Sequence, residues 1–258
     1  MSSIYQHFRP EEAPFIDKVT SWIEQVEIQY APKLTDFLDP RQMQIVQMMV
    51  GTKGEVKVDF HGGNETLERK RALLYPSYYQ PVESDYQLQA FKITYPSKFV
   101  TIEHRQILGS LMNVGLKREK FGDILFHEEV WYCIVAHEVS DYVRLQLNAV
   151  GKTKVDVSEC SLVEIPSFKE EWQEKKLTVS SLRLDVIVSN IYSTSRQKAA
   201  EYIQSGLVKV NWQQTDQVSF VCEAGDVISV RRKGRSTIVA IEGHTKKDKI
   251  KVTVGVKK

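Results

Sequence analysis

One stretch near the C-terminus decides how the last third of the chain folds: SRQKAAEYIQSGLVKVN, residues 195–211. Ser195 is a favourable N-cap, and Gly206 is the residue type that most often follows the end of a helix. The residues between them therefore predict a helix, and the short apolar run Leu207–Val210 predicts a strand directly after it. A tight glycine turn would hold the strand residues Lys209 and Asn211 near the start of that helix.

The cations at the start of this predicted helix occupy an electrostatically unfavourable place. Arg196 and Lys198 fall in the first turn, where the helix dipole favours anions. A phosphate bound there would be held by free backbone N–H groups and by two cationic side chains. A solvated helix end is the alternative interpretation of the same residues.

A second basic run strengthens the case for a polyanionic partner. Four cations lie within five residues after the predicted strand Val227–Val230, namely Arg231, Arg232, Lys233 and Arg235. From Ser181 onward the chain has 14 Lys and Arg against 7 Asp and Glu, whereas the first 180 residues have 21 against 26. A basic terminal module on an acidic body favours RNA, and we expect its cations to converge into one cradle.

The middle of the chain shows alternating strand and helix patterns. Strands are expected at Gln87–Tyr95, Ile124–Phe126, Val130–Ala136 and Val155–Val157, with Leu162–Ile165 as a further strand candidate, and helices at Glu103–Val114 and Val139–Val150. This order, βαββαβ, is that of ferredoxin-like and RRM-like domains. Trp131 and Tyr132 alternate in the third strand, so the pattern indicates no aromatic RNA-binding platform of the RRM type.

The N-terminal part is predicted to be mainly helical. A helix is expected over Glu11–Tyr30, a second from Asp39-Pro40 to Val50, and a strand at Glu55–Phe60. We therefore expect an α+β protein with a mainly helical domain (1–82), an RRM-like βαββαβ domain (83–166), a linker (167–180) and a C-terminal RNA-binding domain (181–258).

The C-terminal pattern resembles an S4 RNA-binding domain over roughly Ser181–Ile241. The matching segments are Arg183-Leu184-Asp185, Ser195-Arg196-x-x-Ala199, Ile203-x-x-Gly206-x-Val208-x-Val210-Asn211 and Gly225-Asp226-x-Ile228-Ser229-Val230-Arg231. S4 domains bind structured RNA, and the resemblance implies RNA contacts at Arg183, Ser195, Arg196, Lys198, Lys209 and Asn211, and more loosely at Arg231, Arg232, Lys233 and Arg235. Trp212 stands where many S4 domains have glycine.

The whole chain resembles the YlmH family of bacterial S4 proteins. The segments that carry this likeness are Phe37–Arg41, Arg69–Pro76 and His104–Ile124. The resemblance implies an RNA-binding protein of the large ribosomal subunit that contacts ribosomal RNA and tRNA during quality control of stalled translation. It also implies a link to cell division.

Two further basic segments are candidates for a second RNA contact. Arg69, Lys70 and Arg71 fit either a phosphate contact or a solvated helix face. The second segment fits a phosphate clamp or an ordinary exposed connection equally well, and its candidate residues are His104, Arg105, Lys117, Arg118 and Lys120.

The alternative function is an S4-domain RNA-modifying enzyme, of pseudouridine synthase or methyltransferase type. The chain's one Arg-Leu-Asp, residues 183–185, belongs to the S4 match, and no glycine-rich cofactor loop follows an early strand. Histidines and three cysteines are scattered without metal-ligand spacing, so we expect no metal, no cofactor and no catalysis. No apolar run approaches a membrane span and no signal sequence is evident, which favours a cytoplasmic location.

Overall fold

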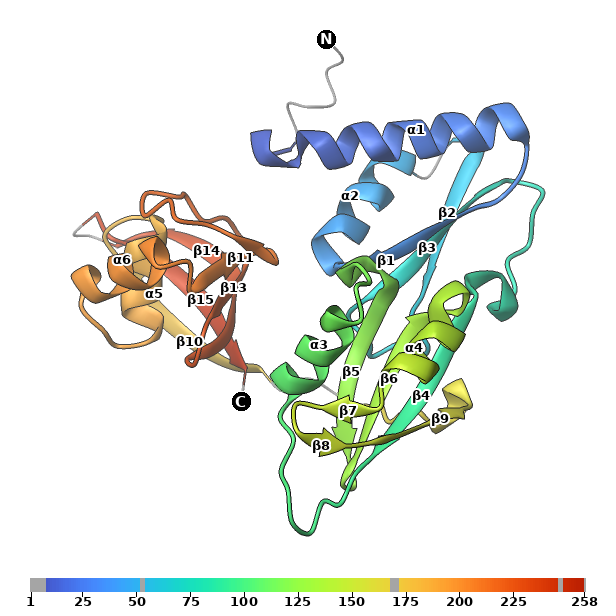
Figure 1. Cartoon of the computed structure of the whole chain (residues 1–258). Coiled ribbons are helices and arrows are strands. Elements are labelled where there is room, and N and C mark those ends of the chain that lie inside the picture. The colour runs from blue at the N-terminus through green and yellow to red at the C-terminus, as the bar shows by residue number, and fades with distance from the viewer. Residues whose placement is uncertain (1–7, 52–53, 168–171, 246–247, 258) are drawn as a thin grey trace. The chain divides into compact units, whose positions relative to one another are not determined.

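The computed structural model describes residues 8–51, 54–167, 172–245 and 248–257. Internal contacts divide the chain into two compact units, Met1–Phe168 and Lys169–Lys258 (Figure 1). The N-terminal unit includes both the predicted helical region and the predicted RRM-like region.

The N-terminal unit begins with two helices packed on a small antiparallel sheet. A 3-10 turn, Pro10–Glu12, leads into α1 (Ala13–Gln29), and the remaining elements are β1 (Lys33–Leu38), α2 (Pro40–Val50), β2 (Val56–His61) and β3 (Lys70–Pro76), with sheet order β1-β3-β2. Both predicted helices are confirmed. α2 begins as expected, because the Asp39 carboxylate accepts a hydrogen bond of 2.9 Å from Gln42 N, and it ends at Gly51 with φ of 65°.

β1 and β3 are elements that the sequence did not predict. β3 is the central strand of this sheet, and Ala72 and Leu74 lie in the core beneath Val19 and Trp22 of α1. Its first residues, Lys70 and Arg71, are therefore in a strand and not on a helix face.

The predicted βαββαβ order of the middle region is confirmed. Its elements are β4 (Leu88–Thr94), α3 (His104–Asn113), β5 (Phe121–His127), β6 (Val130–Ala136), α4 (Ser140–Gln146) and β9 (Asp156–Cys160), with sheet order β5-β6-β4-β9 and every pair antiparallel. A short hairpin, β7 (Ala149–Val150) and β8 (Thr153–Lys154), follows α4 where the sequence predicted more helix. The strand expected at Leu162–Ile165 is wrong, because Leu162–Glu164 forms a 3-10 turn after β9 has filled the last sheet position.

Both faces of this middle sheet are covered by protein. Phe91 and Trp131 belong to the core under α3 and α4. On the opposite face, Ala90, Ile134 and Ala136 pack in one cluster with Phe37 of the first sheet. The approach is close, since a Cβ added to Gly122 would stand 2.8 Å from the Phe37 ring. RRM domains stack bases on that second face, so much of it is closed here.

The C-terminal unit is a six-stranded antiparallel sheet with two helices. Its elements are β10 (Trp172–Val179), α5 (Leu184–Ile191), α6 (Arg196–Gln204), β11 (Val208–Val210), β12 (Gln213–Gln214), β13 (Val227–Val230), β14 (Gly234–His244) and β15 (Ile250–Lys257), in the sheet order β10-β15-β14-β13-β11-β12.

The linker predicted over residues 167–180 differs from the structure. Residues 168–171 lie outside the described part, but Trp172–Val179 forms β10, which pairs with β15 along its whole length. Its charged composition concealed the strand, because an edge strand with one face in water accommodates charges. Leu177 and Val179 are the residues of β10 that pack into the core on its inner face.

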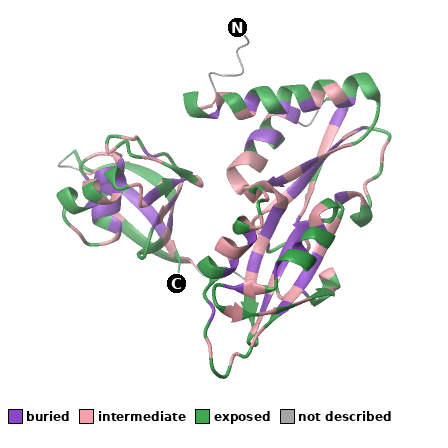
Figure 2. Cartoon of the chain, viewed as in Figure 1, coloured by how far each residue is buried: buried purple, intermediate pink, exposed green. Residues whose placement is uncertain are grey.

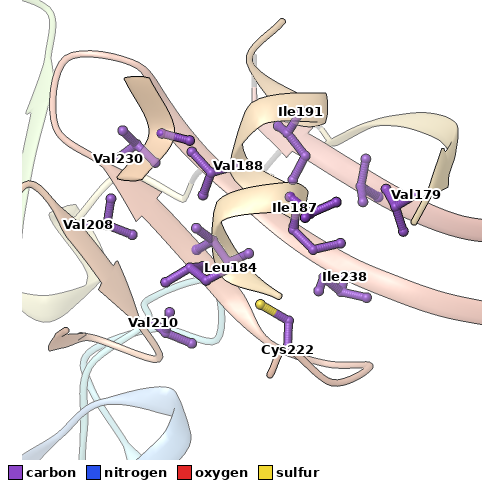
Figure 3. Packing of buried hydrophobic residues seen from close by; sticks show 14 of the residues in the cluster. Val179, Leu184, Ile187, Val188, Ile191, Val208, Val210, Cys222, Val230 and Ile238 are labelled. Atoms are coloured by element: carbon purple, nitrogen blue, oxygen red, sulfur yellow. The ribbon is translucent and has the colours of Figure 1, made fainter. Parts of the chain in front are cut away.

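The core of the C-terminal unit lies between α5 and one face of the sheet (Figure 3). Leu184, Ile187 and Val188 of α5 are buried against Val208 and Ile238 of the strands. Figure 2 shows the buried residues gathered in α5 and on the strands it covers. Because side chains alternate along a strand, the residues between these valines and isoleucines lie on the opposite face of the sheet.

Candidate nucleic-acid interface

A buried carboxylate joins two of the predicted RNA-binding arginines. Asp185, in the first turn of α5, accepts hydrogen bonds from Arg183 Nε at 3.1 Å and from Arg196 at 2.7 Å (Nη2) and 3.1 Å (Nε). The Asp185 side chain is 5% exposed, whereas those of Arg183 and Arg196 are 42% and 59% exposed. The carboxylate thus holds two guanidinium groups at the surface with donors still open to solvent.

Electrostatics keeps this carboxylate ionised. Burial alone raises the pKa of Asp185, but the hydrogen bonds and charges of Arg196 and Arg183 outweigh burial and hold the pKa below its ordinary value. The arginines therefore keep a charged partner throughout the neutral range, and their orientation is maintained.

The start of α6 is formed as the sequence predicts. Ser195 Oγ accepts a hydrogen bond of 3.1 Å from Lys198 N, so this N-cap occupies one of the free N–H groups. The Lys198 ammonium lies 3.0 Å from Glu201 and 5.6 Å from the Tyr202 ring centroid. Arg196 and Lys198 are both half-exposed or more, so their charges stand at the helix start near its remaining N–H groups.

Asn211 is used inside the fold. Its Nδ2 donates to Asp226 Oδ1 at 2.8 Å and its Oδ1 accepts from Val227 N at 2.9 Å. Asn211 and Trp212 have φ of 48° and 66° and form the two-residue turn between β11 and β12, the geometry of a type I′ hairpin. Asn211 therefore shapes the turn, and Trp212 adopts the left-handed conformation that glycine usually supplies.

The predicted cations of the C-terminal unit do not form a single cradle. Lys209 lies between the buried Val208 and Val210, so its side chain points away from α5 and α6. Lys209 pairs with Ser229, which pairs with Arg235, so these three residues form a row on the outer face of the sheet. Arg183, Arg196 and Lys198 form a separate group on the helices.

The third basic group, Arg231, Arg232 and Lys233, is exposed in the turn between β13 and β14. Tyr192, at the end of α5, donates a hydrogen bond of 3.1 Å from its hydroxyl to Gly234 O in the same turn. This contact attaches the turn to the helical side of the unit.

In the N-terminal unit, Arg69 and Arg71 are occupied by internal contacts. Arg71 is 4% exposed, and it donates to Thr35 O at 2.7 Å and to Gln87 O at 3.0 Å while lying 3.1 Å from Glu138. Arg69 donates to Phe37 O at 2.9 Å. The sequence offered a phosphate contact or a solvated helix face for this segment. Neither describes these two arginines, because their guanidinium groups join strands and loops within the unit.

Arg118 and Lys120 also turn inward. Arg118 donates to the carbonyl oxygens of Phe121 and Gly122, and burial lowers its pKa to about 10, with Arg69 as a further cause. The Lys120 ammonium lies 2.6 Å from Asp36 and 3.0 Å from Glu138. Lys120 thus connects the middle region to β1 of the first sheet, whereas the contacts of Arg118 stay within the middle sheet.

The remaining candidates of the N-terminal unit are more open. Lys117 is 82% exposed with its ammonium 4.0 Å from Glu119, and Arg105 is 70% exposed and paired with Glu103. His104 is exposed beside Trp131, with ring centroids 6.2 Å apart. Lys70 is half-buried and donates to Glu65 O.

The residue that sequence reasoning missed is Asp185. It was noticed as part of Arg-Leu-Asp, but its contact with an arginine eleven residues later was not foreseen. The signal that was available is a carboxylate in a mostly apolar segment, preceded by one arginine and followed by another at a predicted helix start.

Across the described residues, no group of three or more His, Cys, Asp or Glu side chains is arranged to hold a metal ion. Likewise, none of the helices in the described part of the chain is long and apolar enough to cross a membrane.

Three family models match consecutive parts of the chain. They are described as "YlmH, N-terminal" at residues 11–79, "Putative RNA-binding domain in YlmH" at residues 81–164, and "S4 domain" at residues 182–228. The first two follow the first sheet and the middle sheet, and the third runs from just before α5 into β13 of the C-terminal unit.

Proteins of known name are similar either over nearly the whole chain or over about a quarter of it. Ribosome-associated protein quality control protein P2 of Bacillus subtilis is 46% identical over 255 residues, covering 98% of both chains. Small ribosomal subunit protein uS4 of Thermoanaerobacter sp. is 39% identical over 64 residues, or 24% of this chain and 31% of that protein. A solved structure, cell division protein ylmH from Streptococcus pneumoniae, aligns at TM-score 0.54 and 36% identity over 62% of this chain and 97% of its own.

Proposed function

Because the chain belongs to the YlmH family, we propose that it is a non-catalytic RNA-binding protein that acts on the ribosome in the quality control of stalled translation. Its partners are ribosomal RNA and tRNA on the large ribosomal subunit, and its location is the cytoplasm. The name of the Bacillus subtilis relative supports the ribosomal role, and that of the Streptococcus pneumoniae relative supports a link to cell division.

The observation that carries this proposal is the group of cations on α5 and α6. Asp185 orients Arg183 and Arg196, and Lys198 stands beside them at the start of α6. Pre-oriented guanidinium groups suit phosphate oxygens, which accept two hydrogen bonds from one arginine. Binding should therefore be dominated by phosphate neutralisation, with selectivity arising from the shape of the RNA.

The same geometry disfavours the enzymatic alternative. A pseudouridine synthase needs an aspartate in the Arg-Leu-Asp context that is available to attack a nucleotide. In this chain that aspartate is Asp185, which is 5% exposed and bound by two arginines. Its carboxylate serves to position the arginines.

The proposal is tested by replacing Arg196 and Lys198 with alanine together. We expect weaker binding to large ribosomal subunits, and a plot of log K against log salt whose slope is smaller by roughly one unit for each lost phosphate contact. The matched control replaces Lys152 and Lys154, two exposed cations of the β7–β8 hairpin, and should leave both quantities unchanged. Unchanged affinity and slope in the folded Arg196→Ala/Lys198→Ala variant would refute the proposed surface.

Two further measurements separate the ribosomal role from the alternative. The protein should sediment with large subunits that carry peptidyl-tRNA. Mass spectrometry of ribosomal RNA and tRNA from cells lacking the protein should show every modification still present, whereas a missing modification would show an enzyme.

A further inference from the structure

The outer face of the C-terminal sheet, which points away from α5 and α6, has its own row of cations. Lys209 of β11 is in register with Ser229 of β13, and Ser229 with Arg235 of β14. The neighbours of these residues, Val208, Val230 and Ser236, are buried on the helical side. The alternation therefore places Lys209 and Arg235 together on the outer face.

Trp212 lies at one end of this row. It stands in the β11–β12 turn, and its ring centroid is 5.8 Å from the guanidinium carbon of Arg235. Its φ of 66° is unfavourable for a side chain larger than glycine, and a bulky residue in this conformation is a rare feature that concentrates at functional sites. The turn thus holds an aromatic ring against a cation where glycine would serve the backbone better.

A second tryptophan, Trp172, lies across the sheet. It is the first residue of β10 and pairs with Lys257 of β15. Its ring covers Gly255, because a Cβ added to Gly255 would lie 3.4 Å from Cε3 of Trp172 and 3.0 Å from Cγ2 of Thr237. Thr237 follows Arg235 by two residues in β14, so the ring of Trp172 is on the same face as Arg235. Because Gly255 has no side chain, the Trp172 ring can pack directly on the backbone of β15.

The charge of the outer face complements a polyanion. Lys209, Arg235 and Lys257 lie between or beside the tryptophans. Glu174 and Glu242 also reach this face, and Glu242 is engaged by Thr253 at 2.6 Å and by Lys176 at 3.8 Å. Cations therefore predominate around the aromatic rings.

We propose that this outer face, which comprises Trp172, Lys209, Trp212, Arg235 and Lys257, binds an unpaired stretch of RNA, with bases stacked on the tryptophans and phosphates at the cations. Four strand spacings separate β11 from β10, or about 19 Å, which is enough for several nucleotides. Aromatic rings beside cations are the usual platform for single strands, whereas paired RNA hides the faces of its bases. The site goes beyond the proposed function, because the helical cations would bind structured RNA without it.

The test compares the full chain with a Trp212→Gly variant, using a fluorescently labelled oligouridylate as the unpaired strand. Glycine suits the left-handed turn, so the variant should fold with an unchanged or higher thermal midpoint. Its affinity for oligouridylate should fall about 5- to 100-fold, the range expected for losing one base stack. Inorganic polyphosphate, which has charge but no bases, should bind the variant and the wild type equally well.

The matched control is Trp22→Phe, which alters a buried tryptophan of α1 in the N-terminal unit and should leave oligouridylate binding unchanged. The proposal is overturned if Trp212→Gly binds oligouridylate as tightly as the wild type, or if the wild type does not bind it. Equal losses for oligouridylate and polyphosphate would show a purely ionic surface and would also refute stacking. Adding Trp212→Gly to the Arg196→Ala/Lys198→Ala variant should lower its oligouridylate affinity by the same factor as in the wild type, so failure of the outer face leaves the helical surface to be judged on ribosomal subunits.

Discussion

Two basic segments that look alike in the sequence differ in the structure: the cations of one are exposed to solvent, and those of the other contact acceptors inside their own unit. At the start of α6, Arg196 and Lys198 keep half or more of their side chains exposed. After α3, Arg118 and Lys120 turn toward carbonyl oxygens and carboxylates of their own unit. A dense run of cations is therefore insufficient to identify an RNA site, because acceptors elsewhere in the fold decide whether the charges reach solvent.

The difference has a physical cause. A buried guanidinium is stable only when acceptors satisfy its donors. Arg71 therefore lies against backbone carbonyl oxygens and Glu138, and Arg118 lies against the carbonyl oxygens of Phe121 and Gly122. On α5 the burial is reversed: the carboxylate of Asp185 is inside and its arginines are outside. The N-terminal unit uses its arginines to join two sheets, whereas the C-terminal unit displays them.

The largest expected effect comes from breaking the internal network. Arg71→Met should lower the free energy of unfolding of the N-terminal unit by about 3–5 kcal/mol, because it leaves buried carbonyl groups and Glu138 without their partner. Hydrogen exchange followed by mass spectrometry can report the two units separately, and it should show loss of protection in β3 but not in α5. Lys117→Met makes the same change of charge at an exposed site and should shift stability by no more than about 0.5 kcal/mol. Equal effects of the two substitutions would contradict the distinction.

A smaller effect is expected at Asp185. Asp185→Asn should destabilise the C-terminal unit by about 1 kcal/mol, a modest value because its arginine partners are solvent-exposed. It should also weaken RNA binding, since Arg183 and Arg196 lose their common anchor. Both effects can be measured at neutral pH by denaturant unfolding and by titration with ribosomal subunits.

The pH dependence of the same residue follows from its lowered pKa. A carboxylate with a folded-state pKa below its unfolded value of about 4 contributes fully above that value, and its contribution is lost as the pH falls through the folded pKa. The wild type should therefore lose stability in the C-terminal unit below about pH 4. Asp185→Asn should show a shallower decline there, and an identical acid profile for the two proteins would count against the ion pairs.

The smallest effect is expected for the exposed cations left in the N-terminal unit. Arg105→Ala/Lys117→Ala should leave stability unchanged and reduce the salt slope of RNA binding by less than one unit, because each cation already lies near a glutamate. A reduction of two units would show that Arg105 of α3 and Lys117 of the following connection form a phosphate clamp equal to α6. The measurement thus decides the alternative that the sequence left open for this segment.

Patterns within one element were predictable from the sequence. Asp39-Pro40 and Gly51 bound α2 as expected, and the middle sheet follows the expected βαββαβ order. Capping and periodicity depend on neighbouring residues, so a local pattern suffices for them. β10 was missed because Trp172–Val179 is an edge strand whose partner, β15, is more than 70 residues away. The residues of a charged segment do not by themselves indicate pairing with a strand so distant in the sequence.

The sequence by itself determined the family, the cap and turn positions, the order of elements in the middle region and the basic character of the C-terminal unit. The tertiary structure alone decided which cations are displayed: it placed Arg71 and Arg118 among internal acceptors, set Asp185 beneath Arg196, and separated Lys209 and Arg235 from the helices by the thickness of the sheet. The reason is that exposure depends on residues distant in sequence, through long-range strand pairing and burial, whereas helix caps and charge content are properties of a few consecutive residues.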